Sequence, residues 1–110
     1  MTVMTMPRVD AVEEIRRFNL SITTAMGAAG ISRQKLADGI GMSRPSLSQR
    51  LLGNQDWQLS EMVSVGNILG VHYKAMLDDE RPWLNDIDPH EVRERLDEIA
   101  GQSMIGSTPP

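Results

Sequence analysis

Residues 32–51 read SRQKLADGIGMSRPSLSQRL, and this stretch predicts two short helices joined by a tight turn. Ser32 is a good N-cap for the first helix, because a serine hydroxyl can accept a hydrogen bond from the unpaired backbone N–H groups of the first turn. Gly41 stands where a residue in the left-handed conformation would end this helix. Its expected inward face consists of Leu36, Ala37 and Ile40.

The second helix of the pair is predicted over residues 43–52, with Ser43 as its N-cap and Gly53 at its end. Leu47 and Leu51 are four residues apart, so they share one face, which we expect to be buried. The opposite face carries Arg44, Pro45, Ser48 and Gln49. The proline falls in the first turn, where it removes no intrahelical hydrogen bond.

A longer helix is predicted before this pair, from about Val9 to Ala29, and Gly27 and Gly30 are expected to end it. Apolar residues recur in it every three or four positions, which is typical of the buried stripe of an amphipathic helix. The stripe consists of Val12, Ile15, Phe18, Ile22 and Met26.

Two helices are predicted directly after the pair. The first has Ser60 as its N-cap and Glu61 in its first turn, and it ends at Gly70. Its inward residues are Met62, Val65 and Leu69, and Trp57 is expected to pack over its start. A short helix over residues 72–77 follows.

The remaining chain is predicted to form an acidic linker over residues 78–88, a helix over 89–100 and a loose tail over 101–110. Asp88 and Pro89 are a favourable helix start. The apolar stripe of this last helix is Val92, Leu96 and Ile99. It can fold back on its own domain or pair with a second copy of the chain, and we favour dimerisation through these three residues.

The composition of the 110-residue chain predicts one all-α domain and excludes several functional classes. There is no cysteine, which excludes a disulfide framework, a thiolate zinc site and a cysteine nucleophile. No histidine–carboxylate cluster or phosphate-binding loop is present, so we expect no enzyme activity, metal, cofactor or small-molecule ligand. The chain lacks a bilayer-spanning apolar stretch and its start lacks a secretory signal, so the expected location is the cytoplasm, without membrane contact.

Charge is distributed unevenly, although the net charge of the whole chain is −4. Residues 31–55 carry four cations against one acid, a net charge of +3, whereas residues 78–110 carry nine acids against three arginines, a net charge of −6. Both helices of the pair begin with cations and no acid, although a helix N-terminus favours acids. Because backbone N–H groups and cations together attract anions, this pattern indicates an anionic partner.

The order of the helices and the residues 32–51 resemble the lambda-repressor-like helix-turn-helix family of bacterial and phage regulators, the Cro and XRE group. Ala37, Gly41 and Leu47 match the positions that bring the two helices together, form the turn and fix the second helix on the core. The resemblance covers residues 9–77 and implies a five-helix DNA-binding domain, with the helix over residues 43–52 in the major groove. It further implies a repressor that binds a palindromic double-stranded operator as a homodimer.

The resemblance and the predicted faces assign a role to each polar residue of the pair. Base-reading residues are expected to be Arg44, Pro45, Ser48 and Gln49. Phosphate contacts are expected from Arg33, Gln34, Lys35, Ser43, Ser46, Arg50 and Asn54. Three residues depart from the family pattern. Arg33 replaces a frequent glutamine, Pro45 removes a polar contact and is expected to touch a thymine methyl group instead, and Gly39 costs a helix about 1 kcal/mol relative to alanine.

An alternative function remains open from the sequence alone. The chain can be a protein-interaction module, such as an antitoxin that binds a partner protein through the helix over residues 89–100.

Overall fold

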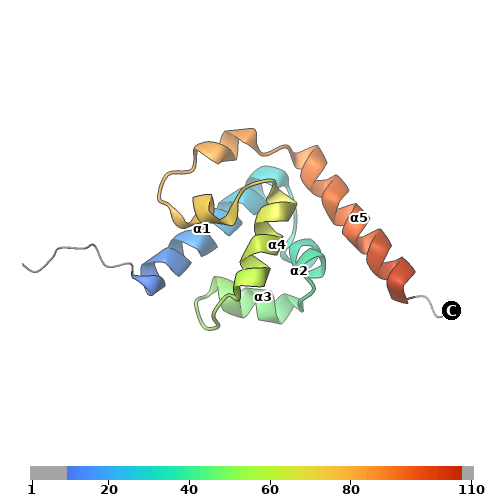
Figure 1. Cartoon of the computed structure of the whole chain (residues 1–110), viewed down its shortest axis with the longest axis horizontal. Helices are drawn as coiled ribbons and strands as arrows, with labels where there is room; N and C mark the ends of the chain where they lie inside the picture. The colour runs from blue at the N-terminus through green and yellow to red at the C-terminus, as the bar shows by residue number, and fades with distance from the viewer. Residues whose placement is uncertain (1–9, 108–110) are drawn as a thin grey trace, which may run out of the picture.

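The protein is all-helical over the part of the chain that the computed structural model describes, which is the backbone of residues 10–107 and the side chains of residues 10–102. Figure 1 shows α2 and α4 between the longer helices α1 and α5, with α3 along the lower edge of the molecule. In chain order the elements are α1 (Ala11–Ala29), α2 (Arg33–Ile40), α3 (Arg44–Leu51), α4 (Leu59–Leu69), the 3-10 helices η1 (Tyr73–Leu77) and η2 (Pro82–Asp86), and α5 (Pro89–Ser107).

The helices begin and end largely where the sequence predicts. Ser32 and Ser43 cap α2 and α3, and Gly41 ends α2 with φ 74°, in the left-handed region that favours glycine. The prediction that Ser60 caps α4 is wrong. The cap is Gln58, because its backbone N–H donates to the Glu61 carboxylate 2.9 Å away and completes a capping box.

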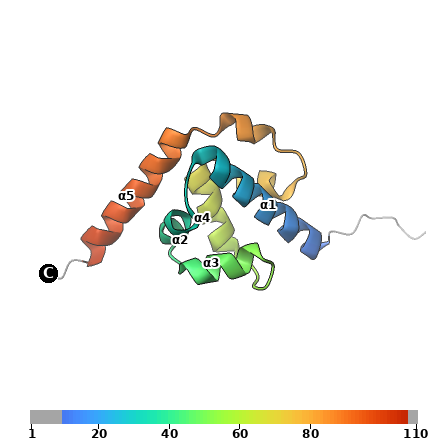
Figure 2. The same cartoon turned by 180° about the vertical axis from the view of Figure 1, so that it is seen from behind.

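One core joins all five α-helices. Fully buried side chains come from α1, α2, α3 and α4 and from η1: Phe18, Ile22, Leu36, Leu47, Val65 and Met76. The prediction that Val12 is buried is wrong, since 80% of it is exposed. The first turn of α1 extends past the rest of the core in both views of the fold (Figures 1 and 2).

The acidic segment 78–88 is more ordered than the predicted linker. It contains η2, and its acids are exposed. Three of its apolar residues are partly buried against the core: Trp83, Leu84 and Ile87. Arg81 also donates from Nε to the hydroxyl of the buried Ser21, 3.1 Å away. These contacts attach the segment to α1.

Helix α5 corrects two predictions. It continues to Ser107, so residues 101–107 are helical and not a loose tail, and the last part of that predicted tail, 108–110, lies outside the described residues. Its stripe packs on its own domain, with Val92 fully buried, Leu96 4% exposed and Ile99 partly buried. These side chains are therefore used within the chain and are not the dimer contact that we favoured. The alternative function stays a prediction, and the three residues of the stripe on which it was based already pack within the chain.

Gly39 in α2 is explained by the docking of α5. A Cβ atom at Gly39 would lie 2.5 Å from Cδ2 of Leu96 and 3.1 Å from Cδ1 of Ile68, so these two side chains would have to shift to admit alanine. Nearby, Nη1 of Arg95 donates to the carbonyl oxygen of Ile68 at 3.0 Å and satisfies the end of α4. The residue that looked unfavourable for a helix thus fits the contact between α2 and α5.

We expect Gly39→Ala to destabilise the protein and Gly27→Ala to stabilise it. Overpacking costs about 1–3 kcal/mol, which exceeds the roughly 1 kcal/mol that alanine gains over glycine in a helix. At Gly27 a Cβ atom meets nothing within 4 Å, so the gain in helix propensity, about 0.5–1 kcal/mol, should appear alone. Urea unfolding of the two variants measures both effects, and an equal gain in stability at the two positions would contradict this packing.

Candidate nucleic-acid interface

Among the α-helices of the described chain, α2 and α3 are the two whose first turns carry cations and no acid. The hydroxyl of Ser32 accepts from the backbone N–H of Lys35 at 3.1 Å, and that of Ser43 accepts from the N–H of Ser46 at 3.2 Å. By contrast, acids occupy the first turns of α1, α4 and α5. The positive ends of two neighbouring helix dipoles therefore remain without a carboxylate in their first turns.

The turn between α2 and α3 fixes how the two helices lie together. The N–H groups of Gly41 and Met42 donate to carbonyl oxygens in the last turn of α2, at 3.3 and 3.0 Å. Ala37 and Leu47, one from each helix, are fully buried. Because their apolar sides face the core, both helices turn their polar sides to solvent.

The polar residues on this outer side form one surface, which we call the α2–α3 surface: Arg33, Arg44, Pro45, Ser48, Gln49 and Asn54. Nη1 of Arg33 lies 3.5 Å from the hydroxyl of Ser48, so a side chain from the start of α2 reaches the middle of α3. Nδ2 of Asn54 donates to Oε1 of Gln49 at 3.0 Å. The structure thus brings together residues that the sequence assigned separately to phosphates and to bases.

Arg44 is the exposed cation at the start of α3. It makes no ion pair with any residue whose side chain the structure describes, whereas Lys35 and Arg50 both pair with acids. Pro45 beside it is also exposed. A cation and an apolar ring therefore stand next to each other at the outer end of α3.

Gln34 and Lys35 lie at the edge of the α2–α3 surface and already have partners. Nε2 of Gln34 donates to Asp38 at 2.8 Å, and Nζ of Lys35 lies 3.5 Å from Asp97 of α5. The side chains of the lysine and its partner are 61% and 70% exposed. Such exposed pairs contribute little, so both residues can exchange these partners for another anion.

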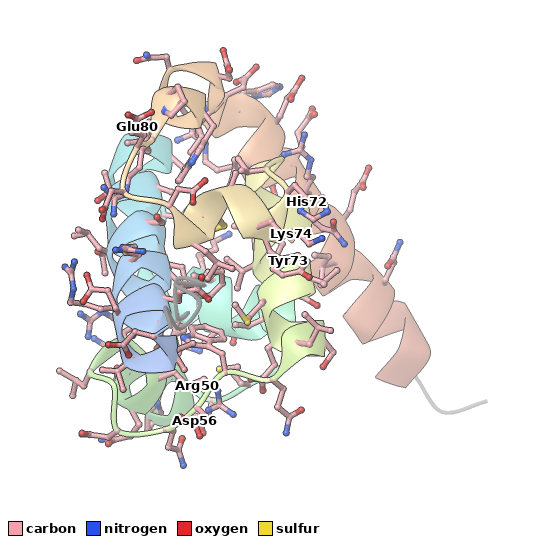
Figure 3. All side chains as sticks on the ribbon, turned by 60° about the vertical axis from the view of Figure 1, so that its left-hand side comes forward. Arg50, Asp56, His72, Tyr73, Lys74 and Glu80 are labelled. Carbon is pink, nitrogen blue, oxygen red and sulfur yellow. The ribbon has the colours of Figure 1, made fainter. Side chains whose placement is uncertain are left out.

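Arg50, which the sequence assigns to a phosphate contact, has partners within its own chain. Its guanidinium group binds Glu61 through Nε and Nη2, both at 3.0 Å, and Nη1 donates to the carbonyl oxygen of Ser46 and to Gln55. Only 15% of its side chain is exposed, and Figure 3 labels it at the end of the molecule that carries α3 and the following loop. The residue joins α3 to α4, and a phosphate contact would require it to give up these partners.

Asn19 is a residue that sequence reasoning missed. Its Nδ2 donates to the carbonyl oxygen of Arg50 at 2.9 Å, and its Oδ1 accepts from Nε1 of Trp57 at 2.7 Å. Asn19, Phe18 and Trp57 are all buried, as the sequence predicts for Trp57. The ring of Trp57 packs edge-on against that of Phe18, with the ring centroids 5.2 Å apart. Asn19 follows Ile15 by four positions, so a polar residue on an apolar stripe was the signal of a buried hydrogen bond.

Other kinds of site are not apparent in the described part of the chain. Residues 10–102 hold no group of three side chains suited to a metal ion, and no described helix is long and apolar enough to cross a membrane. Comparison with known proteins gives no further guidance, since no family model, curated protein or solved structure matches this chain.

We expect Arg50→Ala to lower stability and Arg44→Ala to leave it unchanged. Loss of hydrogen bonds from a charged, largely buried side chain costs about 1.5–3 kcal/mol, whereas an exposed arginine contributes less than about 0.5 kcal/mol. Urea unfolding of both variants tests the roles assigned here. If the two variants are equally stable, the hydrogen bonds of Arg50 do not stabilise the fold.

Proposed function

We propose that this chain is a sequence-specific regulator of transcription that binds double-stranded DNA, a repressor of the lambda-repressor-like helix-turn-helix type, with α3 in the major groove. The observation that carries the proposal is the pair of adjacent helix starts, capped by serine, free of acids and flanked by Arg33 and Arg44 on one exposed surface. Phosphate is the anion that such helix starts attract, and DNA presents phosphates in rows.

The shape of the α2–α3 surface supports entry into a major groove. An α-helix with its side chains is about 10–12 Å wide, and the major groove of B-DNA is about 12 Å wide. Helix α3 is held to the core by the buried Leu47, and its other side carries short or flexible polar groups. A helix anchored on one side and polar on the other can enter the groove without losing core contacts.

The chemistry of the side chains assigns them to bases and phosphates. Arg44 can donate two hydrogen bonds to O6 and N7 of guanine, Gln49 can pair with adenine, and Pro45 can contact a thymine methyl group. Arg33 and Asn54 are suited to flanking phosphates, together with the N–H groups at the helix starts. Arg33 then exchanges its contact with Ser48, which leaves that hydroxyl for a base.

Lys35 pairs with Asp97, so it can contact a DNA phosphate only by giving up this carboxylate. Its pair with Asp97 is exposed, and a phosphate can replace the carboxylate at little cost. The proposal places the protein in the cytoplasm, where bacterial and phage DNA is accessible to it.

Selection of bound duplexes from a random pool tests the function directly. We expect a defined consensus, and recovery of unrelated duplexes after repeated rounds would overturn sequence-specific binding. The selected duplex then serves in anisotropy titrations at several salt concentrations.

We expect Arg44→Ala, which loses a base contact, and Arg33→Ala, which loses a phosphate contact, to weaken binding to that duplex in different ways. Loss of a base contact should weaken binding about 5- to 150-fold, which corresponds to 1–3 kcal/mol, and relax the preference at one base pair. Loss of a phosphate contact should weaken all duplexes alike and reduce the slope of log K against log salt by about 1.

Arg93→Ala is the matched control, because this exposed arginine lies on α5 near Gly30, outside the α2–α3 surface. It should leave both the affinity and the salt slope unchanged. If Arg44→Ala behaves like Arg93→Ala at every salt concentration, α3 is not the recognition helix.

A further inference from the structure

Helix α3 ends in a tight turn that folds residue 54 back over residue 49. The N–H of Gly53 donates to the carbonyl oxygen of Arg50 at 3.0 Å, and the N–H of Asn54 donates to that of Gln49 at 2.9 Å. Gly53 has φ 83°, in the left-handed region that favours glycine. These two hydrogen bonds form a Schellman motif, and Figure 2 shows the loop that leaves α3 at this turn.

The turn is attached to the core as well as to its own helix. The carbonyl oxygen of Arg50 also accepts from Nδ2 of Asn19 at 2.9 Å, and Asn19 is only 7% exposed. The backbone at the end of α3 is therefore held from α1 too. A side chain that the turn places over α3 starts from a fixed backbone position.

The two side chains that the turn brings together are amides. In a Schellman motif the side chains at these two positions are frequently apolar and contact each other. Here Nδ2 of Asn54 donates to Oε1 of Gln49 at 3.0 Å, and both side chains are exposed. Gln49 follows Pro45 by four positions, so it lies on the outer side of α3. The motif thus places a polar contact on the α2–α3 surface, where the core has no use for it.

The hydrogen bond from Asn54 decides which way the amide of Gln49 faces. Because Oε1 accepts from Asn54, the amide cannot turn over without losing this partner. No residue among the described side chains accepts from Nε2 of Gln49, so its hydrogens are available to a ligand, and Oε1 has a second lone pair. A donor and an acceptor on one fixed amide match N7 and the N6 amino group of adenine.

We propose that Asn54 is a positioning residue, which fixes the amide of Gln49 so that it reads adenine. The inference rests on the proposed function and deepens it, because it couples a residue assigned to a base with one assigned to a phosphate. Nδ2 of Asn54 carries a second hydrogen that can be donated to a phosphate oxygen. One amide then connects the DNA backbone to the side chain that reads the base.

NMR relaxation of the side-chain amides, in the full chain without DNA, tests the link between the two residues. Asn54→Ala should lower the order parameter of the Gln49 side-chain amide, because the amide loses its partner. Gln55→Ala is the matched control, since this neighbouring amide accepts from Arg50 and does not contact Gln49. It should leave the Gln49 amide unchanged. If the Gln49 amide is equally mobile in the wild-type and Asn54→Ala chains, the inference is wrong.

Affinities for the selected duplex and for its single-base variants test what the link does. The base pair that Gln49 reads is the one whose preference Gln49→Ala removes. Asn54→Ala should lower that same preference at least about fivefold. It should have no further effect on this preference in the Gln49→Ala chain, because the two side chains act as a unit. Gln55→Ala should leave the preference unchanged.

Asn54→Asp tests the direction of the hydrogen bond. Aspartate can only accept, so it should take a hydrogen from Nε2 of Gln49 and turn the amide over. The preference for adenine at that base pair should fall at least as far as in Asn54→Ala. The ratio of affinities for two duplexes is the appropriate measure, because repulsion between the added carboxylate and phosphates is the same for both.

The two proposals fail separately. If Asn54→Ala weakens all duplexes alike and reduces the salt slope by about 1, Asn54 is only a phosphate contact, and the positioning role is wrong while the function stands. A Gln49→Ala chain that keeps every base preference overturns the positioning role as well. If the wild-type chain shows no preference among duplexes, the proposed function is wrong and the reading of adenine is wrong with it.

Discussion

The buried amide of Asn19 connects the core of this protein to the surface on which its proposed function depends. Helices α2 and α3 have eight residues each, too few to be stable alone in water. Leu47 holds the middle of α3, and the hydrogen bond from Asn19 to the Arg50 carbonyl holds its end. The same amide accepts from Trp57 and so fixes the start of α4. This junction acts together with the α2–α3 turn and the Arg50–Glu61 pair to fix the direction of the polar side of α3.

The electrostatics of the molecule follow from how α5 docks. Its apolar stripe enters the core because Gly39 leaves room for Leu96, and its acids remain outside. One of them, Asp97, reaches Lys35 at the edge of the α2–α3 surface. The acidic end of the chain thus lies beside the basic segment without covering Arg44. A net negative chain can in this way present a basic surface, since a partner meets the local charge and not the sum.

Local signals in the sequence predicted the elements well, and long-range contacts decided what they missed. Serine caps and Gly41 act within a few residues, so the bounds of α2 and α3 followed from them. The roles of Arg50 and Gly39 depend on partners that lie distant in the sequence, such as Leu96, and helical period alone could not reveal them. The periodicity of α5 identified its stripe correctly but could not say whether the chain's own core or another copy would cover it.

Mapping of amide chemical shifts by NMR, during titration with a selected duplex, shows which residues of the chain contact DNA. If α3 enters the major groove, the largest changes fall on the backbone N–H groups at the starts of α2 and α3, around Arg33 and Arg44, and on the side-chain amides of Gln49 and Asn54. Residues of α5 beyond Asp97 should change little. Changes centred on α5 or η2, with the amides of α2 and α3 unaffected, would contradict it.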